Sequence, residues 1–250
     1  MHLNLAKISG QSRLGKLIRL PLALIPHGVA VPVLQGPLRG ARWIVGASTH
    51  GCWMGSYEFT KQRLFARIVR PGQVVYDVGA NVGFYTLLAS VLVGPTGKVV
   101  AFEPLPRNVD YLRSHIKLNH CDNTTLVTAA VSDVMGTARF DGSGDNSMAH
   151  LTPDGTLTVE TVTLDHVVGT QGEPPPQVIK IDVEGAEVAV LQGGRHTIET
   201  YRPTIFLALH GPELQRDCCA WLRARGYRLT PVTGTLAQSD EILAVAASPL

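Results

Sequence analysis

Short apolar runs rich in β-branched residues alternate along the chain with longer segments of helical periodicity. The runs occupy residues 74–78, 98–103, 124–131, 178–182 and 204–210. The segments between the first three runs have apolar positions every three or four residues, which is typical of amphipathic helices. Strands separated by helices of this length predict βαβ units and a parallel sheet covered on both faces. The pattern therefore predicts an α/β fold.

Two pairs of strand-like runs fall outside this alternation. Residues 227–232 and 241–246 are separated by a turn-rich segment, which predicts an antiparallel hairpin at the edge of the sheet. Residues 137–140 and 157–162 flank a segment, 141–154, that is rich in Gly, Asp, Asn and Ser. We interpret this second pair as an inserted β-hairpin or loop after the third strand. It either shapes a substrate pocket or forms a plain surface hairpin.

Composition restricts the class of protein further. The 250 residues include 45 % apolar and only 17 % charged residues, which argues against disorder and coiled coils. The formal net charge is +2, and lysine and arginine do not gather into a concentrated stripe. Nothing in the sequence therefore calls for a nucleic acid as partner.

Residues 1–58 differ from the rest of the chain in their charge. Residues 1–60 contain six basic residues and a single acid, Glu58. The apolar stretch 14–34 is broken by basic residues and prolines, which excludes a membrane-spanning helix and argues against a signal peptide. We expect a short basic and apolar helix here that packs on the main domain, 59–250. A lid, a homodimer contact and a membrane-surface segment are the alternatives.

The four cysteines point to the cellular compartment. Cys52, Cys121, Cys218 and Cys219 form no CxxC pair, and no histidine spacing matches a zinc site. Free thiols in a reducing environment are the simplest interpretation. We therefore expect a cytoplasmic protein, with association at a membrane surface left open.

The sharpest motif is a strand that runs into a glycine-containing turn and then a helix, over residues 74–83. Gly79 and Gly83 would let a ligand approach the backbone closely, near the unpaired N–H groups of the helix. Asn81 stands where a dinucleotide fingerprint has its second glycine. Asp77 would repel a pyrophosphate but attract the ammonium group of S-adenosylmethionine. The turn thus favours S-adenosylmethionine, and an NAD-dependent oxidoreductase is the alternative.

Further candidates for the cofactor site follow the next two strands. Glu103 ends the second strand, 26 residues after Asp77, where a carboxylate can accept hydrogen bonds from both ribose hydroxyls. The third strand ends in small residues, Ala129 to Val131, which could flank an adenine ring. Glu58 interrupts an otherwise acid-free segment, and we expect it to face the cofactor or the acceptor.

Candidate catalytic residues follow the fourth and fifth strands. Asp182 and Glu184 come just after the fourth strand, and His210 ends the fifth. Any of the three could accept a hydroxyl proton, and together they could hold a divalent ion such as Mg²⁺. Lys180 is a further candidate, although it could simply pair with Glu187 or another acid. The acids could equally complement a helix dipole without catalytic duty.

Four motifs occur in an order that resembles the FkbM family of S-adenosylmethionine-dependent methyltransferases. They are GSYE at 55–58, DVGANVG at 77–83, FEP at 102–104 and IKIDVEGAE at 179–187. The resemblance implies a Rossmann-like class I methyltransferase with a seven-stranded, mostly parallel sheet and a terminal antiparallel strand. It implies methyl transfer to a hydroxyl of a sugar, glycolipid or polyketide-type molecule, which yields S-adenosylhomocysteine.

The resemblance carries the family's cofactor-binding positions onto Asp77, Gly79, Asn81 and Glu103. We also expect Glu58, Val131 and Asp182 to contact the cofactor. One position departs from the family. The family usually has a Glu before the apolar residue and the His, whereas this chain has Ala208, Leu209 and His210. Any role of that glutamate therefore does not transfer.

Overall fold

The computed structural model describes residues 24–141, 150–151, 155–236 and 238–247. Within them, seven strands form a central sheet in the order β12-β13-β11-β10-β3-β4-β5. The parallel strands are β3 (Val74–Val78), β4 (Lys98–Phe102), β5 (Thr124–Val127), β10 (Val178–Ile181) and β11 (Thr204–Ala208). The strand β13 (Glu241–Ala246) runs antiparallel between β11 and β12 (Tyr227–Pro231). The predicted sheet with its terminal antiparallel strand is confirmed.

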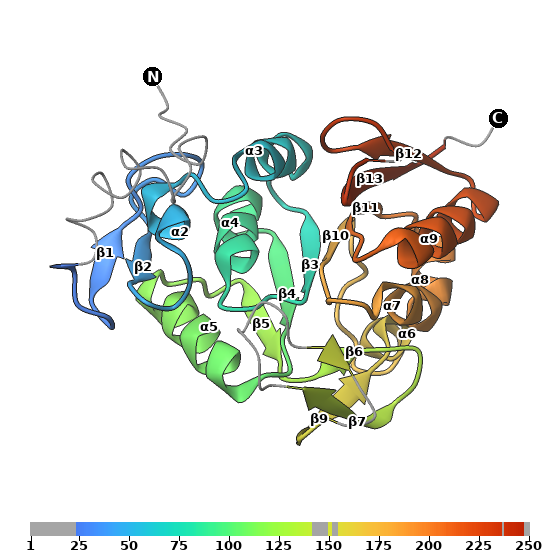
Figure 1. Cartoon of the computed structure of the whole chain (residues 1–250), viewed down its shortest axis with the longest axis horizontal. Helices are drawn as coiled ribbons and strands as arrows, with labels where there is room; N and C mark the ends of the chain where they lie inside the picture. The colour runs from blue at the N-terminus through green and yellow to red at the C-terminus, as the bar shows by residue number, and fades with distance from the viewer. Residues whose placement is uncertain (1–23, 142–149, 152–154, 237, 248–250) are drawn as a thin grey trace.

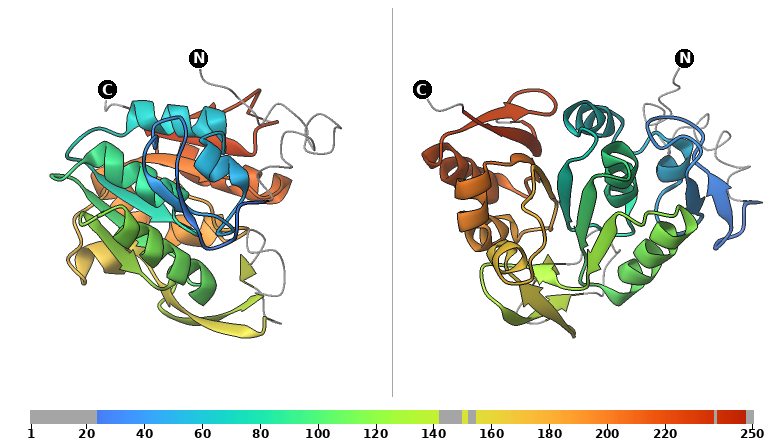
Figure 2. Two further views of the ribbon diagram at one scale, coloured as in Figure 1. Left: turned by 90° about the vertical axis from the view of Figure 1, so that its left-hand side faces the viewer. Right: turned by 180° about the vertical axis from the view of Figure 1, so that it is seen from behind.

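Helices cover both faces of this sheet, as the apolar strands predicted (Figures 1 and 2). One face is covered by α3 (Phe59–Ile68), α4 (Phe84–Val93) and α5 (Pro106–Leu118). The other is covered by α6 (Leu164–Gly169), α7 (Glu187–Gly193), α8 (Arg195–Tyr201) and α9 (Pro212–Ala224). Successive strand residues alternate between the two cores: Val75 and Val99 pack on the α4 side, whereas Tyr76 and Val100 pack on the α7 side.

The inserted hairpin is confirmed, but the third strand is shorter than predicted. The chain leaves the central sheet after Val127, and β6 (Ala130–Val131) joins a separate four-stranded sheet of order β6-β9-β7-β8. In that sheet β7 (Gly136–Asp141) pairs antiparallel with β9 (Leu157–Val162), and β8 spans His150–Leu151. Residues 142–149 and 152–154 of the predicted loop lie outside the described residues.

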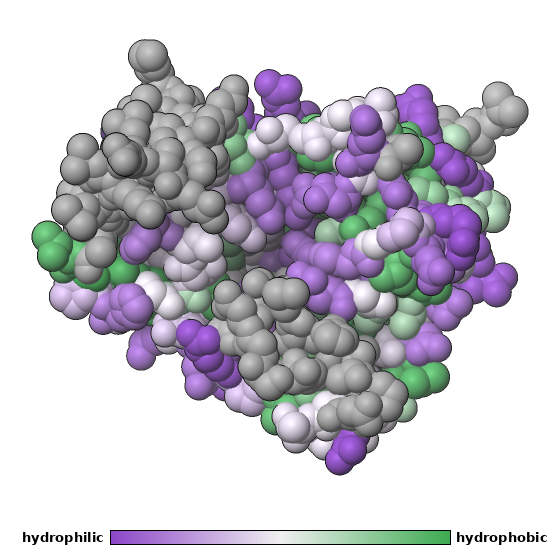
Figure 3. All heavy atoms as spheres, viewed as in Figure 1, coloured by the Kyte–Doolittle hydropathy of each residue, from purple (hydrophilic) through white to green (hydrophobic). Residues whose placement is uncertain are grey.

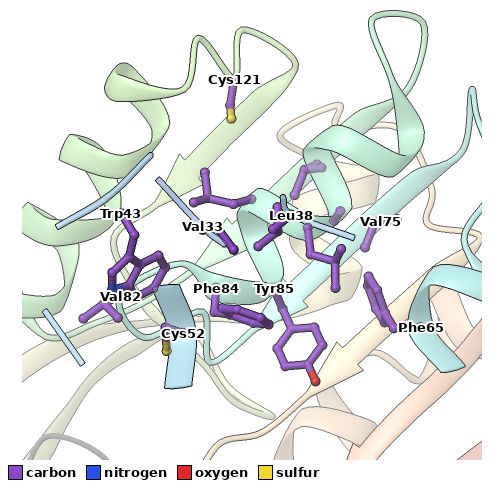
Figure 4. Packing of buried hydrophobic residues seen from close by; sticks show 14 of the residues in the cluster. Val33, Leu38, Trp43, Cys52, Phe65, Val75, Val82, Phe84, Tyr85 and Cys121 are labelled. Atoms are coloured by element: carbon purple, nitrogen blue, oxygen red, sulfur yellow. The ribbon is translucent and has the colours of Figure 1, made fainter. Parts of the chain in front are cut away.

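The segment before α3 packs directly on the main domain. It contains the antiparallel pair β1 (Ala30–Pro32) and β2 (Arg42–Ile44), and the helix α2 (His50–Met54). Trp43 is fully buried and stacks on His115 of α5. It also meets Phe84 edge-on, within the buried cluster drawn in Figure 4. Residues on both sides of the predicted boundary at residue 58 therefore share one core.

The helix predicted within 14–34 is wrong where it reaches β1, since Ala30, Val31 and Pro32 are extended and pair with β2. Its remainder up to residue 23 lies outside the described residues. No helix in the described part of the chain is long and apolar enough to cross a membrane. All four cysteines are buried and free of disulfides, as expected.

Candidate active site

A cavity of about 990 Å³ opens where parallel strands of the central sheet end and their order reverses between β3 and β10. Ligands commonly bind at such a switch point. Residues predicted from four separate segments line it: Asn81 after β3, Glu103 after β4, Asp182 after β10 and His210 after β11. Figure 3 shows that this side of the molecule is hollowed near its middle, with hydrophilic residues around the hollow.

Other predicted site residues share this cavity. Glu58, Gly79, Val131, Lys180 and Glu184 belong to its lining. Most of the predicted site residues therefore lie at one site. Asp77 is the exception, because its side chain is not part of the lining.

Glu103 is held by the backbone of the turn that it faces. Its Oε2 accepts a hydrogen bond from the Asn81 N–H at 2.8 Å, and Oε1 accepts from the Leu105 N–H at 3.0 Å and from Asn108 Nδ2 at 3.2 Å. Burial raises the pKa of Glu103, and these hydrogen bonds act in the opposite direction. A carboxylate can accept about four hydrogen bonds, so Glu103 retains capacity for a ligand.

The turn after β3 depends on close packing that glycine permits. Gly79 has φ of +76°, and a Cβ there would overlap the backbone oxygen of Asp182. Asn81 also lies in the left-handed region, at φ of 51°, which Asn tolerates better than most residues. The small side chains of Ala129, Ala130 and Val131 line the same cavity. This set of a ribose-type acid and small apolar residues fits the adenosine of S-adenosylmethionine.

Asp77 lies beneath the turn, and its direct contact with the cofactor stays a prediction. The side chain is buried, accepts a hydrogen bond from Thr86 Oγ1 at 2.6 Å and lies 3.3 Å from Lys180 Nζ. Lys180 also donates to the Gly79 carbonyl at 2.8 Å and lies 3.6 Å from Asp182. Lys180 thus neutralises Asp77, and its expected pairing with an acid is made with Asp77 and Asp182 rather than with Glu187.

Lys61 is a buried member of the site that the sequence analysis missed. Its Nζ lies 3.1 Å from Glu58 and 3.5 Å from Asp182, and it also forms an ion pair with Glu241 at the start of β13. Burial alone would lower the pKa of Lys61, but the three carboxylates raise it. The available signal was its position four residues before Phe65, on the buried face of α3.

Glu58 lies at the rim of this network. It precedes α3 in a left-handed conformation, and its Oε2 accepts a hydrogen bond from the hydroxyl of Tyr85 at 2.8 Å. Burial and the charge of Glu58 raise the pKa of that hydroxyl well above its usual range. Tyr85 is therefore a neutral donor that fixes Glu58 in the cavity wall.

His210 lies among three acids that follow β10 in the chain. Its Nδ1 lies 2.6 Å from Oε1 of Glu187, and its Nε2 lies 3.3 Å from Glu184 and 3.8 Å from Asp182. The hydrogen bond to the Glu187 carboxylate raises the pKa of His210; burial opposes the shift and the neighbouring carboxylates add to it. Burial would raise the pKa of Asp182, but Lys180, Lys61 and His210 together lower it.

The side chains of Asp182, Glu184 and His210 lie close enough together to hold a metal ion. One ligand atom from each of Asp182, Glu184 and His210 lies within 4.8 Å of the others. However, Lys61 and Lys180 lie within 3.6 Å of the same Asp182 carboxylate. Their positive charges compete with a divalent cation for that ligand, so the donor set fits such an ion poorly.

Comparison with known protein families agrees with the resemblance noted in the sequence. A family model described as the methyltransferase FkbM domain matches residues 77–229. The chain is 28 % identical over 214 residues to the 31-O-demethyl-FK506 methyltransferase FkbM of Streptomyces tacrolimicus, covering 72 % of this chain and 82 % of the relative.

Two further relatives are matched over a smaller part of their length. The hexuronic acid methyltransferase AglP of Haloferax volcanii is 28 % identical over 55 % of this chain and 56 % of its own length. The 2-O-methyltransferase NoeI of Sinorhizobium fredii is 27 % identical over 56 % of this chain and 65 % of its own length. The match thus spans just over half of AglP and just under two thirds of NoeI.

Solved structures show the same fold. The methyltransferase FkbM of Methylobacillus flagellatus superposes with a TM-score of 0.53 at 16 % identity, over 79 % of this chain and 55 % of that one. The O-methyltransferase TomG of Streptomyces achromogenes, in complex with S-adenosylmethionine, gives a TM-score of 0.50 at 12 % identity, over 77 % of this chain and 81 % of that one.

The comparisons do not support magnesium, and they argue against the NAD-dependent alternative. The sequence motifs, the sheet and the family match together place this chain in the FkbM family of class I methyltransferases.

Proposed function

We propose that this protein is an S-adenosylmethionine-dependent O-methyltransferase that acts on a hydroxyl of a sugar, glycolipid or polyketide-type small molecule. The observation that carries the proposal is a single cavity that joins two chemically different halves. Glu103 and the small side chains of β6 form one half, and the acids around His210 form the other. The names of three relatives support it: a hexuronic acid methyltransferase, a 2-O-methyltransferase and a 31-O-demethyl-FK506 methyltransferase.

The first half of the cavity suits the cofactor. Glu103 would accept hydrogen bonds from the ribose hydroxyls, and Val131 would pack against the adenine. Glu58 and Asp182, which also line the cavity, would face the ammonium-bearing end, where their negative charge is favourable. Asp77 would act through Lys180, which ties it to the Gly79 carbonyl. When bound, S-adenosylmethionine supplies a methyl group on a positively charged sulfur, which an acceptor oxygen displaces in line.

His210 is the proposed general base. The bond from its Nδ1 to the buried carboxylate of Glu187 places the proton on Nδ1 and leaves the lone pair of Nε2 toward Glu184 and Asp182. That nitrogen can accept the proton that the acceptor hydroxyl loses as its oxygen forms the new bond to carbon. A positioned base of this kind contributes on the order of 10²–10⁴-fold in rate.

Methyl transfer from isotopically labelled S-adenosylmethionine to a panel of sugars and polyketide alcohols tests the proposal. We expect a labelled methyl ether and S-adenosylhomocysteine in equal amounts. His210→Gln should lower kcat by about 10²–10⁴-fold while the cofactor still binds. His196→Gln, at an exposed position of α8, is the matched control and should have normal activity. A fully active His210→Gln variant would overturn the assignment of the base.

A further inference from the structure

The lining of the cavity is rich in carboxylates. The carboxylates are Glu58, Glu103, Asp182, Glu184, Asp240 and Glu241, and the permanently charged cations are Lys61, Arg107 and Lys180. With His210 neutral, these side chains carry a formal net charge of −3. A negative wall in a recess of low dielectric constant repels anions and attracts cations.

Two of the three cations are already committed to protein groups. Lys61 is shared by three carboxylates, those of Glu58, Asp182 and Glu241. Lys180 lies between Asp77 and Asp182 and donates to a backbone carbonyl. Both side chains are only 4 % exposed. Neither ammonium group can turn toward an acidic acceptor without breaking its ion pairs with these carboxylates, which is costly.

The third cation lies in the other half of the cavity. Arg107 belongs to the first turn of α5, next to Asn108, which donates to Glu103. Its guanidinium lies 5.9 Å from the ring of Tyr111. Arg107 is thus part of the half assigned to the cofactor. Among the described residues that line the acceptor half, every lysine or arginine is therefore neutralised by acids of this chain.

Bound cofactor does not reverse this balance. S-adenosylmethionine has a sulfonium, an ammonium and a carboxylate, so its net charge is +1. The lining then retains a net charge of −2, and a protonated His210 would reduce it to −1. The remaining carboxylates can accept hydrogen bonds from hydroxyl or ammonium groups of an acceptor.

We infer that the acceptor is an uncharged or amine-bearing polyhydroxyl compound, and that acceptors with a carboxylate or phosphate are methylated at least tenfold more slowly. This inference rests on the proposed function and specifies its substrate class. It also separates this chain from a relative whose name gives hexuronic acid as its substrate. The distinction comes from charge, because a uronic acid has the shape of the corresponding neutral sugar.

A library of matched pyranosides tests the inference. Each set contains a methyl glycoside, the 6-carboxylate analogue, the 6-phosphate and an amino-sugar analogue, and methylated products are detected by mass spectrometry after incubation with S-adenosylmethionine. Calorimetric binding of S-adenosylmethionine is measured first, and its absence would overturn the proposed function itself. With binding established, we expect methylation of neutral or amino members at least tenfold faster than of their acidic analogues. Equal or faster methylation of acidic members, or no methylation of any member, would overturn the inference.

A single substitution should shift this preference. Glu241→Gln removes one negative charge from the wall and one partner from Lys61. We expect the rate ratio of the 6-carboxylate to the neutral glycoside to rise by about tenfold in this variant. Asp217→Asn removes the same charge from an exposed position of α9 outside the cavity and should leave the ratio unchanged. An unchanged ratio in Glu241→Gln would contradict the charge argument.

Discussion

His210 Nδ1 lies 2.6 Å from the carboxylate of Glu187, a side chain at the start of α7 with no exposed surface. The same oxygen of Glu187 also accepts a hydrogen bond from the Gly185 N–H at 3.0 Å. This buried acid therefore orients the imidazole and is the largest cause of its raised pKa. An acid that opens a helix would usually complement the helix dipole, but here it supports the proposed base.

Glu187→Gln should move the pH profile of the enzyme. In the native protein, kcat should rise with pH as His210 loses its proton, with the midpoint above the ordinary histidine pKa because Glu187 raises it. The glutamine can still orient the ring but has no charge, so the midpoint should move to lower pH. We expect the plateau kcat to fall by about tenfold, since a weaker base accepts the proton less readily.

Steady-state kinetics from acidic to alkaline pH would measure this shift. Glu160→Gln, at an exposed position of β9, provides the control and should reproduce the native profile. If Glu187→Gln left the midpoint where it was, the ionisation that limits the rate would not belong to His210.

Gly79→Ala should destabilise the fold at the base of the cofactor turn. The alanine would have to adopt a positive φ, and its Cβ would overlap the Asp182 backbone. We expect a loss of about 3 kcal/mol in the free energy of unfolding. Gly172→Ala isolates the cost of the conformation, because Gly172 has φ of +75°, close to that of Gly79, but nothing lies within 4 Å of the added Cβ. That variant should lose only about 1 kcal/mol. Urea denaturation of both variants measures the difference, and equal losses would refute the close approach.

Lys61→Met should destabilise the protein in a pH-dependent way. Because the folded pKa of Lys61 is raised, its contribution to stability is complete at pH 7 and disappears only as the pH rises through that pKa. Its removal deprives Glu58, Asp182 and Glu241 of a shared cation, at a cost of about 3–5 kcal/mol. The deficit should shrink as the pH falls and Asp182 and Glu241 bind protons.

Denaturation of Lys61→Met at several pH values checks this expectation. Lys117→Met, at an exposed position of α5, should stay within about 0.5 kcal/mol of the native protein. A deficit in Lys61→Met that remained constant down to pH 4 would show that the loss is one of packing rather than of charge.

The sequence predicted the sheet because its strands and helices differ in hydrophobic period. Alternation between the two cores is visible in single strands, as at Val75 and Tyr76. The exit of the chain from the sheet after Val127 was not predictable in this way. Ala130 and Val131 continue the apolar run, but they pair with Thr161 and Val162 of the inserted hairpin. A local pattern does not show which distant strand a segment joins.

A site residue could be predicted where its own segment carries the signal. It could not be predicted where its role depends on a partner that is distant in sequence. Glu103 and His210 follow strands whose ends meet at one edge, and both reach the cavity. Lys61 contacts Asp182 across 121 positions of sequence. The pairing of Asp77 with Lys180, on a neighbouring strand, likewise cannot be identified without the sheet register.

Glu103→Gln should weaken cofactor binding more than it weakens the fold. The glutamine oxygen can still accept one of the backbone bonds from Asn81 and Leu105, but the charge-assisted bonds to ribose hydroxyls are lost. Such bonds are worth about 1.5–3 kcal/mol, so the Kd for S-adenosylmethionine should rise about 10- to 150-fold. Circular dichroism should show an intact fold, and an unchanged Kd would remove Glu103 from the cofactor site.

Calorimetric titration of the native protein with S-adenosylmethionine, and separately with NAD, tests the central claim most directly. We predict saturable, one-to-one binding of S-adenosylmethionine and no binding of NAD. Binding of NAD alone, or of neither compound, would contradict the assignment of this cavity to S-adenosylmethionine.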